Sequence, residues 1–175
     1  MSRPVGHTCK SLSSAVWEVA QYQHKGWLCA YHARSFAAMQ VVLQALATGG
    51  VIYPATRGAQ GSWQQLKHGE IDIASATPSF WRALLWESDG SRIERLQQST
   101  LGGEIADQPL LDSLRDTFPS ARITHLYAST EMGVCFSIHD GKAGFPSSWL
   151  SHPPGQCEIE ISYDGELLLR SRRRM

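Results

Sequence analysis

Hydrophobic residues recur along the chain in two alternating patterns, one with helical spacing and one as short continuous runs. Helical spacing is clear after Ser35, where it continues until Gly49-Gly50 interrupts it. The run Trp27–Tyr31 is short and apolar, which favours a buried strand. The patterns predict helices over residues 11–23, 35–48, 61–68, 78–87 and 107–117, and strands over residues 27–31, 51–53, 71–75, 96–101 and 122–127.

Strands separated by single helices need right-handed crossovers, so these elements predict a mainly parallel sheet flanked by helices. The pattern changes after Tyr127, where residues 134–139, 157–163 and 166–170 are all extended in character. The turn signal Tyr163-Asp164-Gly165 joins the last two as a hairpin. We therefore expect an α/β fold with a small antiparallel β element at the C-terminal end. The division is an α/β subdomain over 1–140 and a β-rich extension over 141–175.

Composition narrows the class of protein. The chain has 175 residues, enough for one core, and its 16 Lys and Arg balance 16 Asp and Glu. This balance argues against nucleic acid as the main partner. No apolar run reaches the roughly 20 residues that span a bilayer, and the N-terminal residues do not resemble a signal peptide, so we expect a cytoplasmic protein. The four cysteines form no Cys-x-x-Cys pair that would indicate zinc.

The most informative chemistry lies in residues 124–133, where a predicted strand ends in a loop. In an open parallel sheet, ligands bind beyond the carboxyl ends of the strands. The Tyr127 ring can stack on a base, and the Thr130 hydroxyl can donate to a phosphate oxygen. The Glu131 carboxylate can hold a divalent cation that bridges phosphates. These residue types suit a nucleotide.

Residues 127–131, Tyr-Ala-Ser-Thr-Glu, resemble the Tyr-Gly-x-Thr-Glu motif of the adenylate-forming superfamily, with Ala128 in place of Gly. That superfamily includes acyl-CoA synthetases, aryl-acid ligases, luciferases and peptide-synthetase adenylation domains. Further segments resemble family elements in the same order and cover nearly the whole chain. They are Tyr31-His32, Ala76-Thr77-Pro78-Ser79, Leu101-Gly102-Gly103-Glu104, Gly144-Phe145-Pro146 and Asp164-Gly165-Glu166-Leu167.

The resemblance implies a role for each matching residue. Thr130 and Glu131 would address the α-phosphate and Mg²⁺, and both are candidate catalytic residues. His32 would lie near the channel by which the acyl group and the thiol enter, and the segment from Ala76 would line the acyl side. The adenine nucleotide would be held by Gly102, Gly103, Glu104, Tyr127, Ala128, Ser129 and Thr130.

Members of this superfamily make acyl-AMP from a carboxylic acid and ATP, then pass the acyl group to a thiol. The implied ligands are ATP or AMP, Mg²⁺, a fatty or aryl acid, and the thiol of coenzyme A or of the phosphopantetheine on a carrier protein. Complete members have a phosphate loop before a Pro-Lys-Gly step, and this sequence begins at that step with Val5 where lysine is usual. They also carry a C-terminal domain with a catalytic lysine. We therefore expect a partial large domain with little or no turnover alone.

Other interpretations stay open. Tyr127 can be a half-buried strand end, Glu131 a solvated carboxylate and His32 a structural histidine. Gly102-Gly103 can be a simple turn, with Glu104 favoured by a helix dipole. The whole chain can be a non-catalytic nucleotide- or acyl-binding module, a split subunit that needs a partner chain or companion domain, or an unrelated small-ligand binder. Strand edges left exposed in a partial domain would favour a homodimer or domain swapping.

Overall fold

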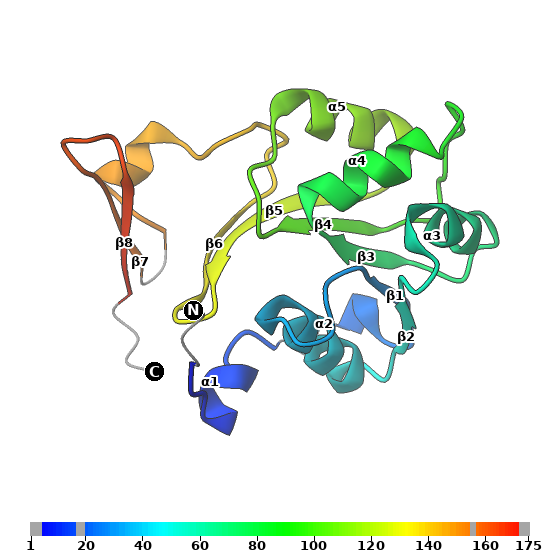
Figure 1. The fold of residues 1–175 in the computed structure, drawn as a ribbon, viewed down its shortest axis with the longest axis horizontal. Helices are drawn as coiled ribbons and strands as arrows, with labels where there is room; N and C mark the ends of the chain where they lie inside the picture. Colours follow the sequence, from blue (N-terminus) through cyan, green and yellow to red (C-terminus); the bar gives the residue numbers. More distant parts are fainter. Residues whose placement is uncertain (1–4, 17–19, 155–156, 172–175) are drawn as a thin grey trace.

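The structure is a computed structural model that describes residues 5–16, 20–154 and 157–171 (Figure 1). It contains a six-stranded sheet and a separate two-stranded sheet. The strands are β1 (Gly26–Cys29), β2 (Val51–Pro54), β3 (Ile73–Ala76), β4 (Gln98–Gly102), β5 (Arg122–Ser129), β6 (Gly133–Ile138), β7 (Cys157–Ile161) and β8 (Leu167–Ser171). The α-helices are α1 (Cys9–Ser13), α2 (Phe36–Ala47), α3 (Gly58–Lys67), α4 (Pro78–Trp86) and α5 (Gln108–Thr117), with 3₁₀ turns η1 (Ala20–Tyr22) and η2 (Ser147–Leu150).

The large sheet has the strand order β2-β1-β3-β4-β5-β6. Strands β1 to β5 are parallel to their neighbours, and β6 pairs antiparallel with β5 at one edge. Strands β7 and β8 form an antiparallel hairpin to one side (Figure 1). The expected fold class, a mainly parallel α/β sheet with a small antiparallel element, is confirmed.

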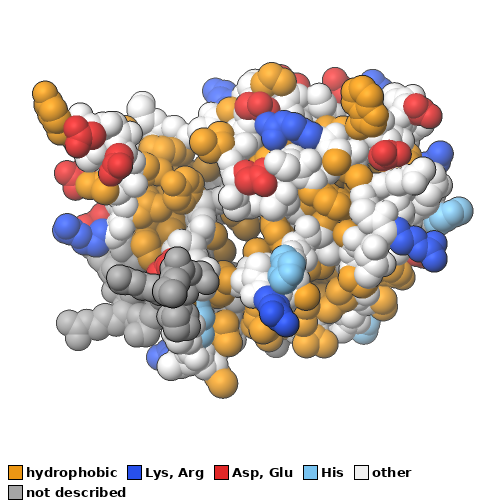
Figure 2. All heavy atoms as spheres, in the orientation of Figure 1, with side chains coloured by type: hydrophobic (Ala, Val, Ile, Leu, Met, Phe, Trp, Pro, Cys, Tyr) orange, Lys and Arg blue, Asp and Glu red, His pale blue; other side chains and the backbone are white. Residues whose placement is uncertain are grey.

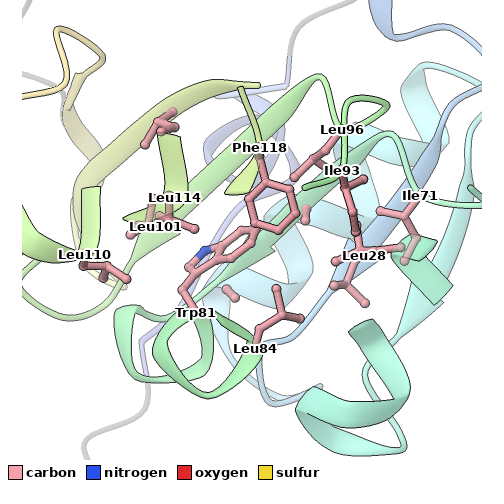
Figure 3. Close-up of a cluster of buried hydrophobic side chains, with 14 of the residues drawn as sticks. Leu28, Ile71, Trp81, Leu84, Ile93, Leu96, Leu101, Leu110, Leu114 and Phe118 are labelled. Atoms are coloured by element: carbon pink, nitrogen blue, oxygen red, sulfur yellow. The ribbon is translucent and has the colours of Figure 1, made fainter. Parts of the chain in front are cut away.

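The main core lies between the sheet and helices α3, α4 and α5, which cover one face together (Figure 1). Alternate residues of each strand point to this face, among them Leu28, Ala74, Leu101 and Ile123. Trp81 of α4 lies at its centre in contact with Phe118 (Figure 3). Burying a side chain of this size contributes about 2–3 kcal/mol, so this face anchors the fold.

The opposite face changes character across the sheet. Over β1 and β3 it is apolar, and Trp27, Cys29 and Ile73 pack there against α2. Over β4 and β5 the residues on this face include Gln98 and Thr124, which are 7% and 9% exposed. Burying polar side chains costs free energy unless they are hydrogen-bonded, so this part of the sheet face differs from the apolar part that packs against α2.

Two predicted elements differ from the structure in kind or in the sheet to which they belong, beyond shifts of a few residues at element ends. The predicted helix over residues 11–23 is instead the short helix α1 and the turn η1, and residues 17–19 lie outside the described residues. The helix begins earlier because Thr8 caps it in a reciprocal pair with Ser11, which the prediction had placed at the start. The segment 134–139 was grouped with the small antiparallel element, but as β6 it belongs to the large sheet. Its pairing with β5 through a tight turn decides this.

The two-stranded sheet packs against β6 through an aromatic cluster. Phe136 of β6 contacts Phe145 and Trp149, with ring centroids 5.6 and 5.5 Å away, and Ile159 of β7 joins the same cluster. This contact begins close to the predicted boundary between residues 140 and 141. The division into two units stays a prediction.

Charged side chains of both signs are mixed over the face drawn in Figure 2, without a block of one sign. None of the helices in the described part of the chain is long and apolar enough to cross a membrane.

Candidate functional site

The carboxyl ends of β4 and β5 lie side by side, as expected for neighbouring parallel strands. Gly102, the last residue of β4, pairs with Leu126, so Gly103 follows next to Tyr127, beyond which β5 continues to Ser129. A cavity of about 270 Å³ opens here on the α2 side of the sheet. Five of the predicted site residues line it: Gly102, Gly103, Ala128, Ser129 and Thr130.

Gly102 lets a tyrosine approach the end of β4. A Cβ at position 102 would lie 3.1 Å from the Tyr31 hydroxyl oxygen, closer than ordinary packing allows. That hydroxyl donates to the Ala76 carbonyl at 2.9 Å and so ties β1 to β3. Burial raises the pKa of Tyr31 above its usual range, which keeps the hydroxyl protonated as a donor. Gly103 has a φ of 86°, a left-handed conformation that favours glycine.

Glu104 binds the start of helix α4. Its Oε2 accepts from the Ser79 backbone N–H at 2.8 Å and from the Ser79 hydroxyl at 2.6 Å. This is the helix-terminal position considered above as an alternative to adenine binding, although the helix is α4 and not the one that follows Glu104 in sequence. The contact fixes the loop at Gly102 and Gly103, which we call the diglycine loop, to α4.

These contacts shift the titration of Glu104. The Ser79 hydroxyl, followed by smaller contributions from the backbone and Arg82, holds the pKa of this carboxyl below its usual value. A folded-state pKa below the unfolded one means that the contact stabilises the fold at pH values above the usual carboxyl pKa. The contribution is lost as the pH falls through the lowered folded-state pKa.

Tyr127 points to the sheet face opposite the cavity, because successive strand residues alternate in direction. Its ring stacks on Phe136, with centroids 5.1 Å apart and planes 22° apart. The residue is still 42% exposed, so the stack does not enclose it. Tyr127 therefore lies next to Gly103, but on the opposite face of the sheet from the residues that line the cavity.

Strand β5 runs two residues further than predicted, to Ser129, and turns back directly into β6. The Met132 N–H donates to the Ser129 hydroxyl at 3.1 Å and tightens this turn, and Gly133 has a φ of 69°. The predicted open loop is therefore a hairpin tip that carries Thr130 and Glu131, both exposed.

The Glu131 carboxylate is exposed and accessible to a cation. It forms no ion pair within the described residues, which also contain no group of three or more potential metal-ligating side chains. A single carboxylate is compatible with Mg²⁺, because this ion is usually held by one or two carboxylates together with substrate phosphates and water.

His32 lies outside the cavity, and its neighbour Tyr31 lies in the lining. The His32 side chain is exposed, and its Nδ1 accepts from the Arg34 backbone N–H at 3.3 Å. Sequence reasoning chose His32 from the pair Tyr31-His32 and missed Tyr31. It also missed Ser35 and Phe36, which line the cavity from the start of α2. Their position directly after a predicted strand end was the signal that could have found them.

The N-terminal segment reaches the same place. The ring of His7 stacks on Phe36 with centroids 5.1 Å apart, and a Cβ at Gly133 would lie 3.9 Å from Phe36. Residues just after the Pro-Val-Gly step are therefore near the hairpin tip. Arg3 and Pro4 of that step lie outside the described residues, whereas Val5 and Gly6 are described.

A second, larger cavity of about 700 Å³ continues along the α2 side of β4, β5 and β6. It shares Gln40, Val41, Ser75, Thr100, Leu126 and Val134 with the first. The two form one groove, which we call the sheet groove. It runs from the hairpin tip toward the N-terminal ends of β4 and β5.

A family model described as "AMP-binding enzyme" matches residues 4–165. The chain belongs to the AMP-binding enzyme family. The Tyr-Ala-Ser-Thr-Glu and Gly-Gly-Glu segments predicted this family, and the match confirms it. None of the curated proteins searched matches the sequence.

Solved structures share the fold. A mutant coronafacic acid ligase from Pectobacterium brasiliense superposes with a TM-score of 0.65 at 21% identity, covering 85% of this chain and 31% of that one. A luciferase-like enzyme from the nonluminescent mealworm Zophobas morio gives 0.62 at 14% identity, covering 84% and 39%. The o-succinylbenzoate coenzyme A synthetase of Bacillus subtilis, solved with ATP and magnesium ion, gives 0.59 at 19%, covering 85% and 33%. The chain thus spans about a third of the length of these structures.

Proposed function

We propose that this chain forms the acyl- and nucleotide-binding wall of a carboxylic acid ligase. The ligase would make acyl-AMP from a carboxylic acid and ATP and pass the acyl group to the thiol of coenzyme A or a carrier protein. The observation that carries the proposal is the cavity at the ends of β4 and β5, lined by Gly102, Gly103, Ala128, Ser129 and Thr130. Family membership makes adenine nucleotide the first ligand to test.

In this proposal, different parts of the acyl-adenylate bind at different places on the sheet. The base would lie at the strand ends between Gly103 and the exposed side of Tyr127, where no side chain extends from Gly103. The acyl group would enter the sheet groove on the α2 side, past Tyr31 and Phe36. The α-phosphate would then lie at the hairpin tip, within reach of the Thr130 hydroxyl.

In the proposed reaction, these residues would orient the acid and ATP and stabilise the charge on the phosphates. The carboxylate of the acid attacks the α-phosphorus of ATP, a new P–O bond forms, and the bond to pyrophosphate breaks. Thr130 would donate a hydrogen bond to the α-phosphate as the attack proceeds. Glu131 would hold Mg²⁺, which offsets charge on the phosphates when bound. A hydroxyl and a carboxylate on a short, tight turn are suitably fixed for this task.

Removing the Tyr127 ring should weaken binding of a non-hydrolysable acyl-AMP analogue by roughly 5- to 150-fold. This range corresponds to the 1–3 kcal/mol that base stacking on an aromatic side chain contributes. Titration calorimetry of Tyr127→Ala and Tyr127→Phe measures it, and the phenylalanine variant should retain most of the affinity. Tyr163→Ala is the matched control, because Tyr163 is fully exposed on the turn of the β7–β8 hairpin. Equal affinity in Tyr127→Ala and the control would contradict the proposal.

A second candidate function is a non-catalytic binding module or a subunit that acts with a partner chain. The chain spans about a third of the length of the matched structures, so ligand binding and turnover have to be tested separately. We expect a polypeptide of these 175 residues alone to show little or no acid-dependent exchange of pyrophosphate into ATP, because they do not include the phosphate loop or the lysine-bearing domain that complete members of the superfamily carry. Clear exchange that Glu131→Ala abolishes would instead assign full adenylation activity to this polypeptide.

A further inference from the structure

The floor of the sheet groove is polar where its neighbours are apolar. Gln98 and Thr100 of β4 and Thr124 of β5 point into it, from the same face on which Trp27 and Ile73 pack against α2. Gln98 and Thr124 are at least nine-tenths buried. A groove that received only an alkyl chain would gain from apolar side chains at these positions, since burying polar groups costs free energy.

Gln98 sets the direction of the hydrogen bonds in this floor. Its Nε2 lies 3.3 Å from the Ser99 carbonyl oxygen, which can only accept, so this end of the amide must be the donor. The two Nε2 protons are shared among this carbonyl and the hydroxyl oxygens of Thr100 at 3.2 Å and Thr124 at 3.0 Å. At the other end of the amide, Oε1 accepts from the Tyr22 hydroxyl at 3.3 Å.

Among the described residues, this arrangement leaves the protons of both hydroxyls without an acceptor. A threonine hydroxyl has one proton to donate, and both threonines already accept from Gln98. Neither hydroxyl donates to any of the described residues. The described lining of the larger cavity also includes Arg122 and His139, and it contains no Asp or Glu. The groove therefore offers donors and a positive charge, which suits an acceptor oxygen on the ligand.

We propose that the acid activated by this protein carries a carbonyl-type oxygen part-way along its chain, and that Thr100 and Thr124 bind it. This inference rests on the proposed function, because it takes the sheet groove as the acyl site. The oxygen can belong to a ketone or to a second carboxylate, since both accept hydrogen bonds from hydroxyls. Gln98 is a positioning residue that turns both hydroxyls toward the ligand.

Strand geometry gives the distance of this oxygen from the reacting carboxyl. Thr124 precedes Ala128 by four residues and Thr100 precedes Gly102 by two, so at about 3.3 Å per residue they lie roughly 7–13 Å from the strand ends. Carbon–carbon bonds are about 1.5 Å long, and an extended chain therefore advances somewhat more than 1 Å per carbon. The acceptor oxygen is expected roughly five to ten carbons from the carboxyl group.

The test uses acyl-AMP analogues that share the adenosine head and differ only in the acyl chain. Three chains of equal length are compared by calorimetry: a saturated chain, one with a keto group in the middle, and one that ends in a second carboxylate. The keto or the carboxylate analogue should bind at least about fivefold more tightly than the saturated one, as expected for one added hydrogen bond.

Thr124→Val should remove that preference, so that the keto and carboxylate analogues bind this variant no more tightly than the saturated one. Thr117→Val is the matched control, because Thr117 ends helix α5 on the other face of the sheet. Gln98→Glu is a second variant. Its carboxylate accepts from both threonines and turns their protons away from the groove, so the same preference should disappear.

The outcomes separate this inference from the proposed function. If all three analogues bind equally well, the inference is overturned while the proposed function stands. If no analogue binds, and adenosine-head binding is absent from the unchanged protein, the proposed function fails and the inference with it. A preference that survives both Thr124→Val and Gln98→Glu also overturns the inference.

Discussion

Replacing Trp81 with alanine should lower the free energy of unfolding by about 3–5 kcal/mol, because it empties the centre of the main core. Trp81 is 1% exposed, and its ring packs edge-to-face on Phe118 with centroids 5.8 Å apart. Its Nε1 also donates to the Thr100 carbonyl at 3.0 Å, which ties helix α4 to strand β4. Urea denaturation followed by circular dichroism measures the change.

The same helix supplies the control. Trp86 lies five residues further along α4 and is 88% exposed, so Trp86→Ala should change the free energy of unfolding by no more than about 0.5 kcal/mol. Similar losses in both variants would contradict the assignment of Trp81 to the core. Trp81→Ala should also weaken binding of the acyl-AMP analogue, in proportion to the fraction of the protein that the substitution leaves unfolded.

Helix starts were predictable because their signals are local. Ser35 and Asp107 begin predicted helices and Thr77 directly precedes one, and each side chain accepts from a backbone N–H three residues later. The exceptions are the first helix, where Thr8 and not Ser11 occupies the cap position, and α3, which begins at Gly58 instead of Gly61 and has no side-chain cap. Several serines in a row offer more than one cap, and pattern alone cannot choose among them.

The strand-end site was predictable in its members but not in its geometry. A parallel sheet brings the ends of β4 and β5 together, so Gly103 and Tyr127 were expected to be neighbours, and they are. Side chains alternate between the two faces of a sheet only as far as the strand extends, so assigning a residue to a face requires knowing where the strand ends. The prediction ended β5 at Tyr127, so it could not separate Tyr127 from Ala128 on opposite faces.

The sheet groove could not be predicted, because it depends on contacts far apart in sequence. Gln98 contacts Thr124 on the neighbouring strand, 26 residues away in sequence, and Tyr22, 76 residues away. Read along the chain, Gln98 and Thr100 are ordinary strand residues. Only the pairing of β4 with β5 shows that they form one polar floor opposite an apolar core.

Gly102→Ala should lower the free energy of unfolding by about 1–3 kcal/mol, as overpacking of a filled site does. The new Cβ would lie 3.1 Å from the Tyr31 hydroxyl oxygen, which would have to shift by a few tenths of an ångström and so strain its bond to the Ala76 carbonyl. Gly6→Ala is the matched control, since a Cβ at position 6 meets nothing within 4 Å. Equal stability of the two variants would contradict this account of Gly102.

A double variant separates two reasons for glycine at this position. If crowding against Tyr31 is the cause of the lost stability, Tyr31→Phe in the Gly102→Ala background should recover part of it, with a coupling of about 0.5–3 kcal/mol between the two sites. The cavity wall at Gly102 would still carry the added methyl group. Binding of the acyl-AMP analogue should therefore stay weak in the double variant even as stability returns. Recovery of both together would mean that Gly102 serves only the packing of Tyr31.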